Sequence, residues 1–156
     1  MIRFERATPD DAPALTAVQK HTFDDDSRRF AGRSGGGPPG YDSVRWQIEM
    51  MSKATVYYKI LADEQIVGGI IVFDQGGGLF HLGRIWIDPA LQGQGNGATA
   101  MQFIEQAHPQ AQRWTLDTPT WAVRNHHFYE KLGYVKIREA GPDGDRMVYY
   151  EKRIAD

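Results

Sequence analysis

Three glycines alternate with other residues at Gly93, Gly95 and Gly97, between an apolar run and an alanine-rich stretch. Glycine lets the backbone adopt positive φ and lets a ligand approach the main chain without meeting a Cβ atom. The first turn of a helix has four backbone N–H groups without intrahelical partners, and these groups attract anions. A glycine-rich turn from a strand into a helix therefore predicts an anion site, most simply for a phosphate ester or a diphosphate. The alternative is a helix start whose glycines serve only close packing.

Two common phosphate loops can be compared with this stretch. A P-loop needs Lys-Ser/Thr after its last glycine, and Ala98-Thr99 stands there instead. The dinucleotide fingerprint G-x-G-x-x-A is matched by Gly93, Gly95 and Ala98, with Asp117 about twenty residues further on. In that fold, however, the glycines directly follow their strand, whereas residues 88–92 intervene here. Dinucleotide binding is kept as a lower-ranked alternative.

Composition limits the class of protein. The chain has 156 residues, 41% hydrophobic residues and a formal charge of −2, which is typical of one globular domain without a basic nucleic-acid footprint. Cysteine is absent, which excludes disulfides and a thiol nucleophile. The longest apolar run, residues 66–73, is too short to span a membrane, and the first residues do not resemble a signal peptide. We therefore expect a cytoplasmic protein with neither a nucleic-acid nor a membrane partner.

The elements that must position the glycine loop follow from periodicity and from helix start and stop signals. Period-two patterns predict strands near residues 2–7, 56–60, 66–73, 79–87, 113–117, 134–139 and 147–152. Helices are expected from Thr8 to about residue 22, from Ser43, over 96–108 and from Thr118 to Gly133, with a loop over 24–40. In the second helix, Val44, Ile48 and Met51 share one face that we expect to be buried. The short turns predict an antiparallel meander in the middle of one mixed α/β domain over residues 1–156.

The glycine loop also resembles a family signature. Gln92-x-x-Gly95-x-Gly97 is similar to the pyrophosphate-binding motif of the GNAT superfamily of N-acetyltransferases. Residues 85–89 resemble the fourth strand of that family and the turn after it, and residues 125–134 resemble its "FYEKLGF" helix end. The resemblance covers nearly the whole chain, because the order of the elements is also the family's order.

This resemblance implies a GNAT-like domain with a mostly antiparallel sheet, splayed between its fourth and fifth strands and flanked by about four helices. It implies transfer of an acetyl group from acetyl-CoA, as co-substrate, to an amine. The loop amides would hold the CoA diphosphate, and the free edge of the fourth strand would pair with the pantetheine arm and stabilise the oxyanion. By position, the cofactor-binding residues are Ile85, Trp86, Ile87, Gln92, Gly93, Gln94, Gly95, Asn96, Gly97 and Ala98.

The helix after the fifth strand carries a candidate general acid. Family members often place a tyrosine at the position of Tyr129, where a phenol with a pKa near ~10 protonates the departing thiolate. The alternative is that Tyr129 only packs, beside the apolar pair Phe128 and Leu132. Asn125 lies one turn earlier on the same face and would bond the pantetheine amide. The family more commonly has its asparagine where this chain has Ala122, so a surface polar role is the alternative for Asn125.

The general base departs from a frequent family pattern. Where some members carry a glutamate on the fourth strand, this chain has His81, whose imidazole has a reference pKa near ~6.5 and could accept the proton of the amine. The alternative is a structural strand histidine. The carboxylates of Glu49, Asp117 and residues 24–26 could attract a cationic amine, or be solvated surface charges. We expect no metal site, because the adjacent His126 and His127 diverge around a helix and lack a third ligand.

The acceptor is expected to be a primary amine of a small molecule or a peptide. The sequence does not define the acceptor further, and it leaves the oligomeric state open, a homodimer included. A second function class has the same fold: a non-catalytic acyl-CoA-binding or sensing module.

Overall fold

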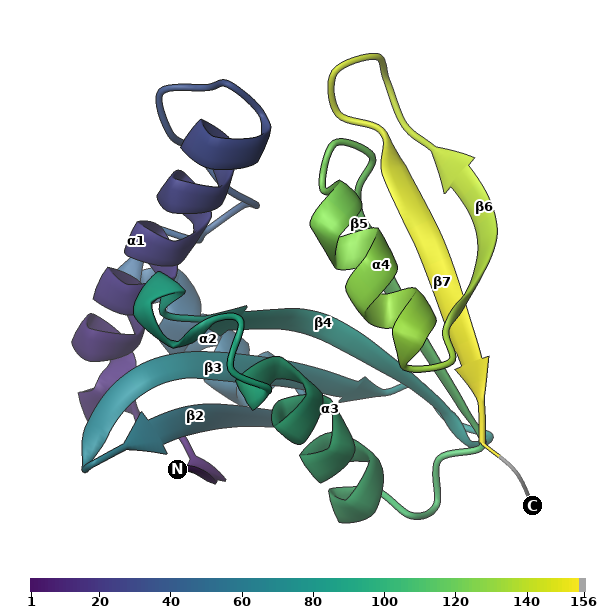
Figure 1. The fold of residues 1–156 in the computed structure, drawn as a ribbon. Helices are drawn as coiled ribbons and strands as arrows, with labels where there is room; N and C mark the ends of the chain where they lie inside the picture. Colours follow the sequence, from purple (N-terminus) through teal and green to yellow (C-terminus); the bar gives the residue numbers. More distant parts are fainter. Residues whose placement is uncertain (155–156) are drawn as a thin grey trace.

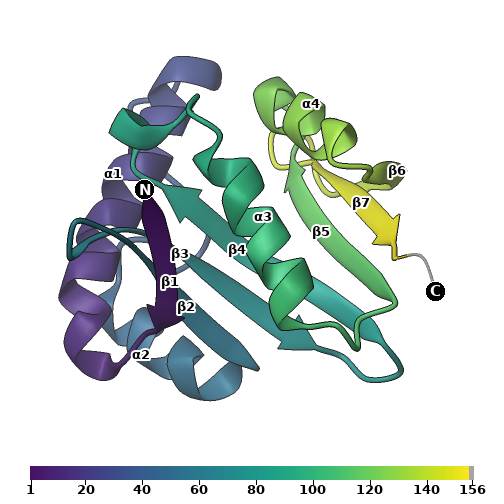
Figure 2. The same ribbon diagram turned by 60° about the horizontal axis from the view of Figure 1, so that its bottom comes forward.

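The computed structural model describes residues 1–154 and contains one seven-stranded sheet flanked by four α-helices (Figures 1 and 2). The elements along the chain are β1 (Ile2–Arg6), η1 (Pro9–Asp11), α1 (Ala12–Phe30), α2 (Val44–Lys53), β2 (Val56–Ala62), β3 (Gln65–Asp74), β4 (Leu79–Ile87), η2 (Pro89–Leu91), α3 (Asn96–Ala107), β5 (Arg113–Pro119), α4 (Val123–Lys131), β6 (Val135–Ala140) and β7 (Met147–Arg153).

The sheet has the strand order β1-β2-β3-β4-β5-β7-β6. All neighbouring strands are antiparallel except β4 and β5, which pair in parallel over residues 79–81 and 113–115 only. Beyond this short pairing the two strands diverge, and Figure 1 shows the two halves of the sheet opening like a V. The expected splay between the fourth and fifth strands is confirmed. The dinucleotide alternative is wrong, because its fold requires a mainly parallel sheet.

The helices cover the two faces of the sheet and enclose two groups of buried side chains. One group lies between α1, α2 and the β2–β4 half and includes Leu15, Tyr57 and Trp86. The larger group lies on the other face, where α3 and α4 pack against the strands, and includes Met101 and Trp114 (Figure 2). Since each half of the sheet is held by its own helices, the divergence of β4 and β5 is a fixed part of the fold.

The first helix is longer than expected. The segment 24–30, predicted as the beginning of a loop, continues α1 to Phe30. Ion pairs one helical turn apart link Lys20 with Asp24 (2.5 Å) and Asp25 with Arg29 (3.2 Å). Such pairs stabilise a helix, so the run of acids and arginines that resembled a loop is a helical surface.

Two other expectations are corrected. The helix predicted from Thr118 begins at Val123, because Thr118 and its neighbour still pair with β7 as the end of β5. In α2, Val44 and Ile48 are 40% and 41% exposed, whereas the polar Gln47 is fully buried. Of the three residues on the predicted face only Met51 packs against the core, so the hydrophobic periodicity was right for Met51 and wrong for Val44 and Ile48. Gln47 must have polar partners inside the protein.

The remaining boundaries lie within a few residues of those expected. The backbone N–H of Thr8 donates to the Asp11 carboxylate at 2.8 Å, as in the predicted helix start. Gly133, the predicted stop of the fourth helix, adopts φ +96°. Within residues 1–154, no helix is both long enough and apolar enough to cross a membrane.

Candidate active site

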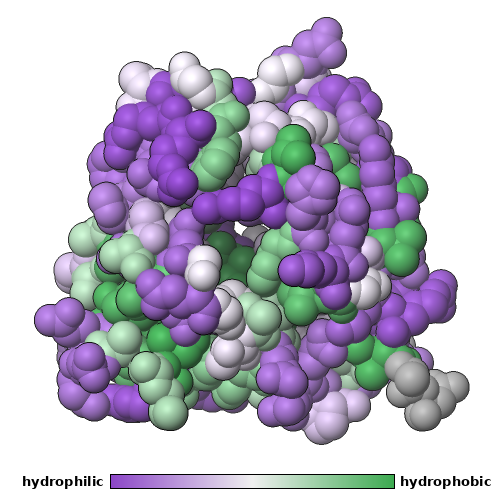
Figure 3. All heavy atoms as spheres, in the orientation of Figure 1, coloured by the Kyte–Doolittle hydropathy of each residue, from purple (hydrophilic) through white to green (hydrophobic). Residues whose placement is uncertain are grey.

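A cavity of about 850 Å³ opens where β4 and β5 diverge. Its walls come from α1, the loop after α1, β4, β5, the start and end of α4, and the loop between β6 and β7. Figure 3 shows the face at which the hollow lies, with hydrophilic atoms at the rim and apolar atoms inside. Of the predicted site residues, His81, Ile85, Asn125 and Tyr129 line this one cavity. Its size falls within the range of small-molecule sites.

His81 lies at the vertex of the V, in the last residue pair that joins β4 to β5. Its Nδ1 is 2.8 Å from the hydroxyl oxygen of Thr115 on β5. Burial lowers the pKa of His81 below its usual value, and the nearby Asp117 opposes this effect. The imidazole is therefore neutral at pH 7. If Nδ1–H donates to Thr115, Nε2 carries the lone pair that a base needs.

Tyr129 is 6% exposed and packs among three aromatic rings. The ring centroids of Phe128, Tyr134 and Tyr150 lie 5.1, 5.9 and 6.2 Å from that of Tyr129. Burial raises the pKa of Tyr129, and the charge of Asp117 adds to the effect. The phenol thus stays protonated at neutral pH and lines the cavity, as a proton donor must. The ring also packs, so the two interpretations of Tyr129 do not exclude each other.

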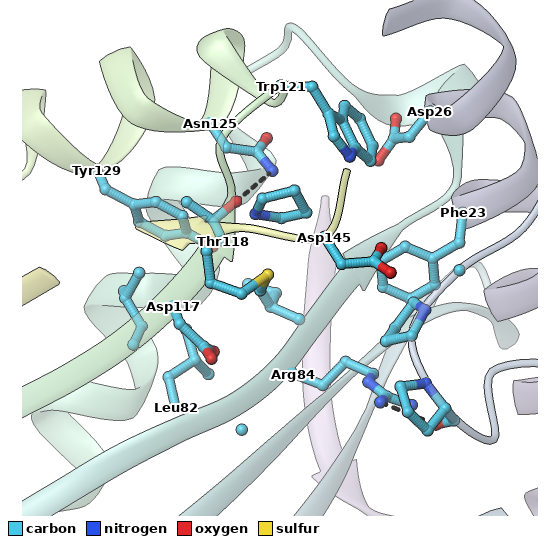
Figure 4. Close-up of a pocket in the computed structure, with 18 of the residues that line it drawn as sticks. Phe23, Asp26, Leu82, Arg84, Asp117, Thr118, Trp121, Asn125, Tyr129 and Asp145 are labelled. Atoms are coloured by element: carbon cyan, nitrogen blue, oxygen red, sulfur yellow. Dashed lines mark hydrogen bonds between the residues drawn. The ribbon is translucent and has the colours of Figure 1, made fainter. Parts of the chain in front are cut away.

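Asn125 stands one helical turn before Tyr129, and both side chains point into the cavity (Figure 4). Its amide nitrogen donates to the hydroxyl of Thr118 at 3.2 Å. The side-chain oxygen of Asn125 remains available for a ligand N–H. The neighbouring His126 approaches the Pro119 carbonyl oxygen at 2.9 Å through Nε2. In the described part of the chain, 1–154, no three His, Asp or Glu side chains are grouped to hold a metal ion.

The glycine loop joins η2 to the first turn of α3. Gly93 and Gly95 adopt φ of +74° and +85°, and a Cβ atom added at either position would meet nothing within 4 Å. Among residues 1–154, no protein acceptor takes a backbone N–H of residues 93–98. A row of free N–H groups beside open space fits an anion such as a diphosphate. Gly97 differs, because a Cβ there would lie 3.0 Å from the ring of Phe128; close packing of α3 against α4 explains this third glycine.

The loop is tied to both walls of the V by one arginine. Arg124 on α4 donates to the Gln92 side-chain oxygen at 2.9 Å and to the Asp26 carboxylate on α1 at 3.2 Å. The Gln92 amide in turn donates to the Ile87 carbonyl oxygen at 2.9 Å. Asp26 lines the cavity, whereas Gln92 and the glycines lie outside its lining. The predicted diphosphate loop and the predicted catalytic residues are therefore separate but connected parts of one site.

The three predicted strand residues differ in environment. Ile85 lines the cavity, Ile87 is buried beside α3, and the Trp86 side chain is 2% exposed on the opposite face, under α1 and α2. All three pair with β3 through their backbones and have no partner on the β5 side. Ile85 lines the cavity, whereas Trp86 and Ile87 are placed to contact a ligand only through their main chain.

Sequence reasoning missed a charged residue in this strand. Arg84 lines the cavity from β4, next to an irregularity in the β3–β4 register at Gly83. The signal was present, because Arg84 is the one charged residue in the otherwise apolar stretch 82–87. In Figure 4, Arg84 and Phe23 lie on one side of the cavity, and Asp117 and Tyr129 lie on the other.

Comparison with known proteins identifies the family and agrees with this fold. A family model described as acetyltransferase (GNAT) domain matches residues 53–136, more than half of the chain. The chain belongs to the GNAT acetyltransferase family.

Solved structures share the fold at low sequence identity. The PaiA N-acetyltransferase of Thermoplasma acidophilum, crystallised with coenzyme A, is 16% identical over 99% of both chains, with a TM-score of 0.76. The ribosomal-protein-S18-alanine N-acetyltransferase of Escherichia coli is 14% identical over 100% of this chain and 96% of that one, at 0.79. A GNAT family acetyltransferase of Elizabethkingia anophelis with acetyl-CoA bound is 12% identical over 98% of both chains, at 0.65. Among curated proteins no match was found.

Proposed function

We propose that this protein transfers the acetyl group of acetyl-CoA directly to a primary amine. The observation that carries the proposal is the conjunction of two features. One is the strand edge that β4 leaves unpaired after His81, and the other is the row of free N–H groups at the start of α3. An extended polyamide arm that ends in a diphosphate fits both features, and acetyl-CoA has this shape.

The binding roles follow from this arrangement. The N–H groups of residues 93–98 would hold the diphosphate, with Gln92 fixed against the Ile87 carbonyl to keep the loop in position. The backbone of residues 85–87 would pair with the pantetheine amides as an added strand does. Asn125 would contribute its side-chain oxygen to the same arm. A backbone N–H of β4 near the vertex would stabilise the oxyanion.

The chemistry needs one base and one acid on the two walls of the cavity. His81 would accept the proton that the ammonium group of the acceptor must lose before its nitrogen can attack the thioester carbonyl. As the carbon–sulfur bond breaks, Tyr129 would donate its phenolic proton to the departing thiolate. Each group starts in the right protonation state, because burial lowers the pKa of His81 and raises that of Tyr129. This separation of pKa values within one site is typical of acid–base pairs.

The decisive experiment measures thiol release from acetyl-CoA in the presence of a panel of primary amines. The chain has no cysteine, so a chromogenic disulfide reagent reports CoA-SH without background from the protein. Amine-dependent thiol release, with an acetylated amine identified by mass spectrometry, would support the proposal. Micromolar CoA binding by calorimetry without turnover on any amine would instead favour the acyl-CoA-binding module.

A further inference from the structure

Arg84 has unused hydrogen-bonding capacity at the cavity wall. Its guanidinium donates to the Gln19 side-chain oxygen at 2.9 Å and to the Pro39 carbonyl oxygen at 3.0 Å. Both acceptors are neutral, and among residues 1–154 no carboxylate forms an ion pair with Arg84. A guanidinium has five N–H donors, so three remain for a ligand.

A buried polar network holds this arginine in place. Gln19 donates to the side-chain oxygen of Gln47 at 3.0 Å, and the Tyr57 hydroxyl donates to the same oxygen at 2.6 Å. Gln19 and Gln47 are fully buried and Tyr57 is 3% exposed. The guanidinium also lies over the Trp46 ring, 4.2 Å from its centroid. Burying these polar side chains costs free energy of desolvation, and their hydrogen bonds hold the guanidinium in one orientation at the cavity.

The charge itself is costly to keep here. Burial lowers the pKa of Arg84 to about 10, so the guanidinium is still protonated at neutral pH. Arg84 is half-buried and has no anionic partner among residues 1–154, and a partly desolvated cation attracts a counterion. Arg84 lines the cavity, so a ligand in the cavity could supply the missing negative charge.

The opposite wall carries the complementary charge. Asp117 lines the cavity from β5 and forms no ion pair within residues 1–154, and Asp145 lies above it in the β6–β7 loop (Figure 4). Apolar surface comes from Phe23 and Trp121. The cavity thus offers a cationic site, an anionic site on the opposite wall and aromatic surface.

The geometry points to an acceptor that carries its own carboxylate within a few bonds of the amine, as a free amino acid does. We propose that Arg84 binds this carboxylate through two parallel N–H···O bonds, while Asp117 attracts the ammonium group towards His81. Bidentate pairing with a carboxylate is the geometry for which arginine is suited. The inference rests on the proposed function, since it names the substrate class of the same site.

The test compares acceptors that differ only in the carboxylate. L-Phenylalanine, L-leucine and L-methionine are each paired with their amides, and kcat/KM is measured for all six with wild type and Arg84→Gln. We expect wild type to use the acids, and the acid-to-amide ratio of kcat/KM to fall about 50-fold in Arg84→Gln, because a charge-assisted pair is lost. Arg84→Lys keeps the charge but loses the planar guanidinium, so its acid-to-amide ratio should lie between those of wild type and Arg84→Gln. Arg28→Gln, on the exposed face of α1 and outside the cavity, is the matched control and should leave the ratio unchanged.

A second variant neutralises the charge of the Arg84 guanidinium without replacing Arg84 itself. Gln19→Glu has nearly the same shape as glutamine and would give the guanidinium an internal carboxylate, so the ratio should fall here too. Circular dichroism and a thermal unfolding midpoint verify that each variant is folded.

The outcomes separate this inference from the proposed function. Turnover of simple monoamines or diamines with none of the three amino acids would refute the carboxylate site and leave acetyl transfer intact. An unchanged acid-to-amide ratio in folded Arg84→Gln would refute it equally. If no amine is acetylated, titration of L-phenylalanine into the CoA-saturated protein still decides: binding that Arg84→Gln loses supports the site, and no binding to wild type overturns it.

Discussion

Replacing Gly95 by valine tests the glycine loop most directly. Two separate effects are expected, because Gly95 adopts φ +85° and a side chain there would project into open space beside free N–H groups. The backbone effect is a loss of stability of about 1–2 kcal/mol, the cost of a left-handed conformation for a residue with a Cβ. The ligand effect is the loss of one or two N–H bonds to the diphosphate, each about 1.5 kcal/mol for a charged acceptor. Together these bonds correspond to a roughly ten- to hundredfold weaker affinity for CoA.

A matched variant separates the two effects. Gly76, in the turn between β3 and β4, adopts φ +90° and also has nothing within 4 Å of an added Cβ. Gly76→Val should lose comparable stability in urea titration but bind CoA like wild type in calorimetry. Unchanged CoA affinity in folded Gly95→Val would contradict our account of the loop, and an equal loss in Gly76→Val would attribute the effect to general destabilisation.

Three further predictions concern single side chains. Tyr129→Phe keeps the ring among its aromatic neighbours and removes the proton donor, so kcat should fall about 10²-fold while calorimetry shows unchanged CoA affinity; near-normal turnover would leave Tyr129 a packing residue. For His81, whose pKa lies below 6.5 because of burial, kcat/KM should rise with pH through a step below pH 6.5, and His81→Gln should abolish that step; a surviving step would place the base elsewhere. Asp24→Ala should lower the free energy of unfolding by about 2 kcal/mol in urea titration, because the carboxylate accepts bonds from the Gly36 N–H and the Tyr41 hydroxyl. The hydrogen bond from Lys20, together with those from Gly36 and Tyr41, lowers the pKa of Asp24 to about 2 against the opposing effect of burial, so the stabilisation is present above about pH 4 and lost as pH falls through 2; equal acid sensitivity of wild type and variant would refute this.

Local patterns were sufficient for most of the architecture. The glycine turn at residues 76–78 and the mainly apolar run after it marked β4 with its observed ends, and Gly133, which adopts a positive φ, marked the end of α4. Two of the errors arose because tertiary contacts overrode local signals. Thr118 could start a helix, yet its pairing with Val148 keeps it in β5. Gln47 is polar in sequence, yet it is buried because Gln19 and other partners satisfy it.

The site was predictable where it depends on backbone and short spacing. Asn125 and Tyr129 are one helical turn apart, so their common orientation towards the cavity followed from the sequence. Arg84 could not be assigned in this way. Its significance arises from Gln19, far away in the sequence, and from the absence of a carboxylate partner in the described residues 1–154, neither of which is visible in a local pattern.

The unpaired edge of β4 has a consequence for how the protein behaves among other proteins. Open strand edges invite pairing with neighbouring chains and so promote aggregation. Here the edge from residue 82 to residue 87 faces the opening between β4 and β5 and not the outer rim of the sheet, so a strand of another protein would have to enter this opening to pair with it. The sheet can therefore keep main-chain N–H and C=O groups free for a narrow, extended ligand, while their position inside the opening disfavours strand pairing with another polypeptide.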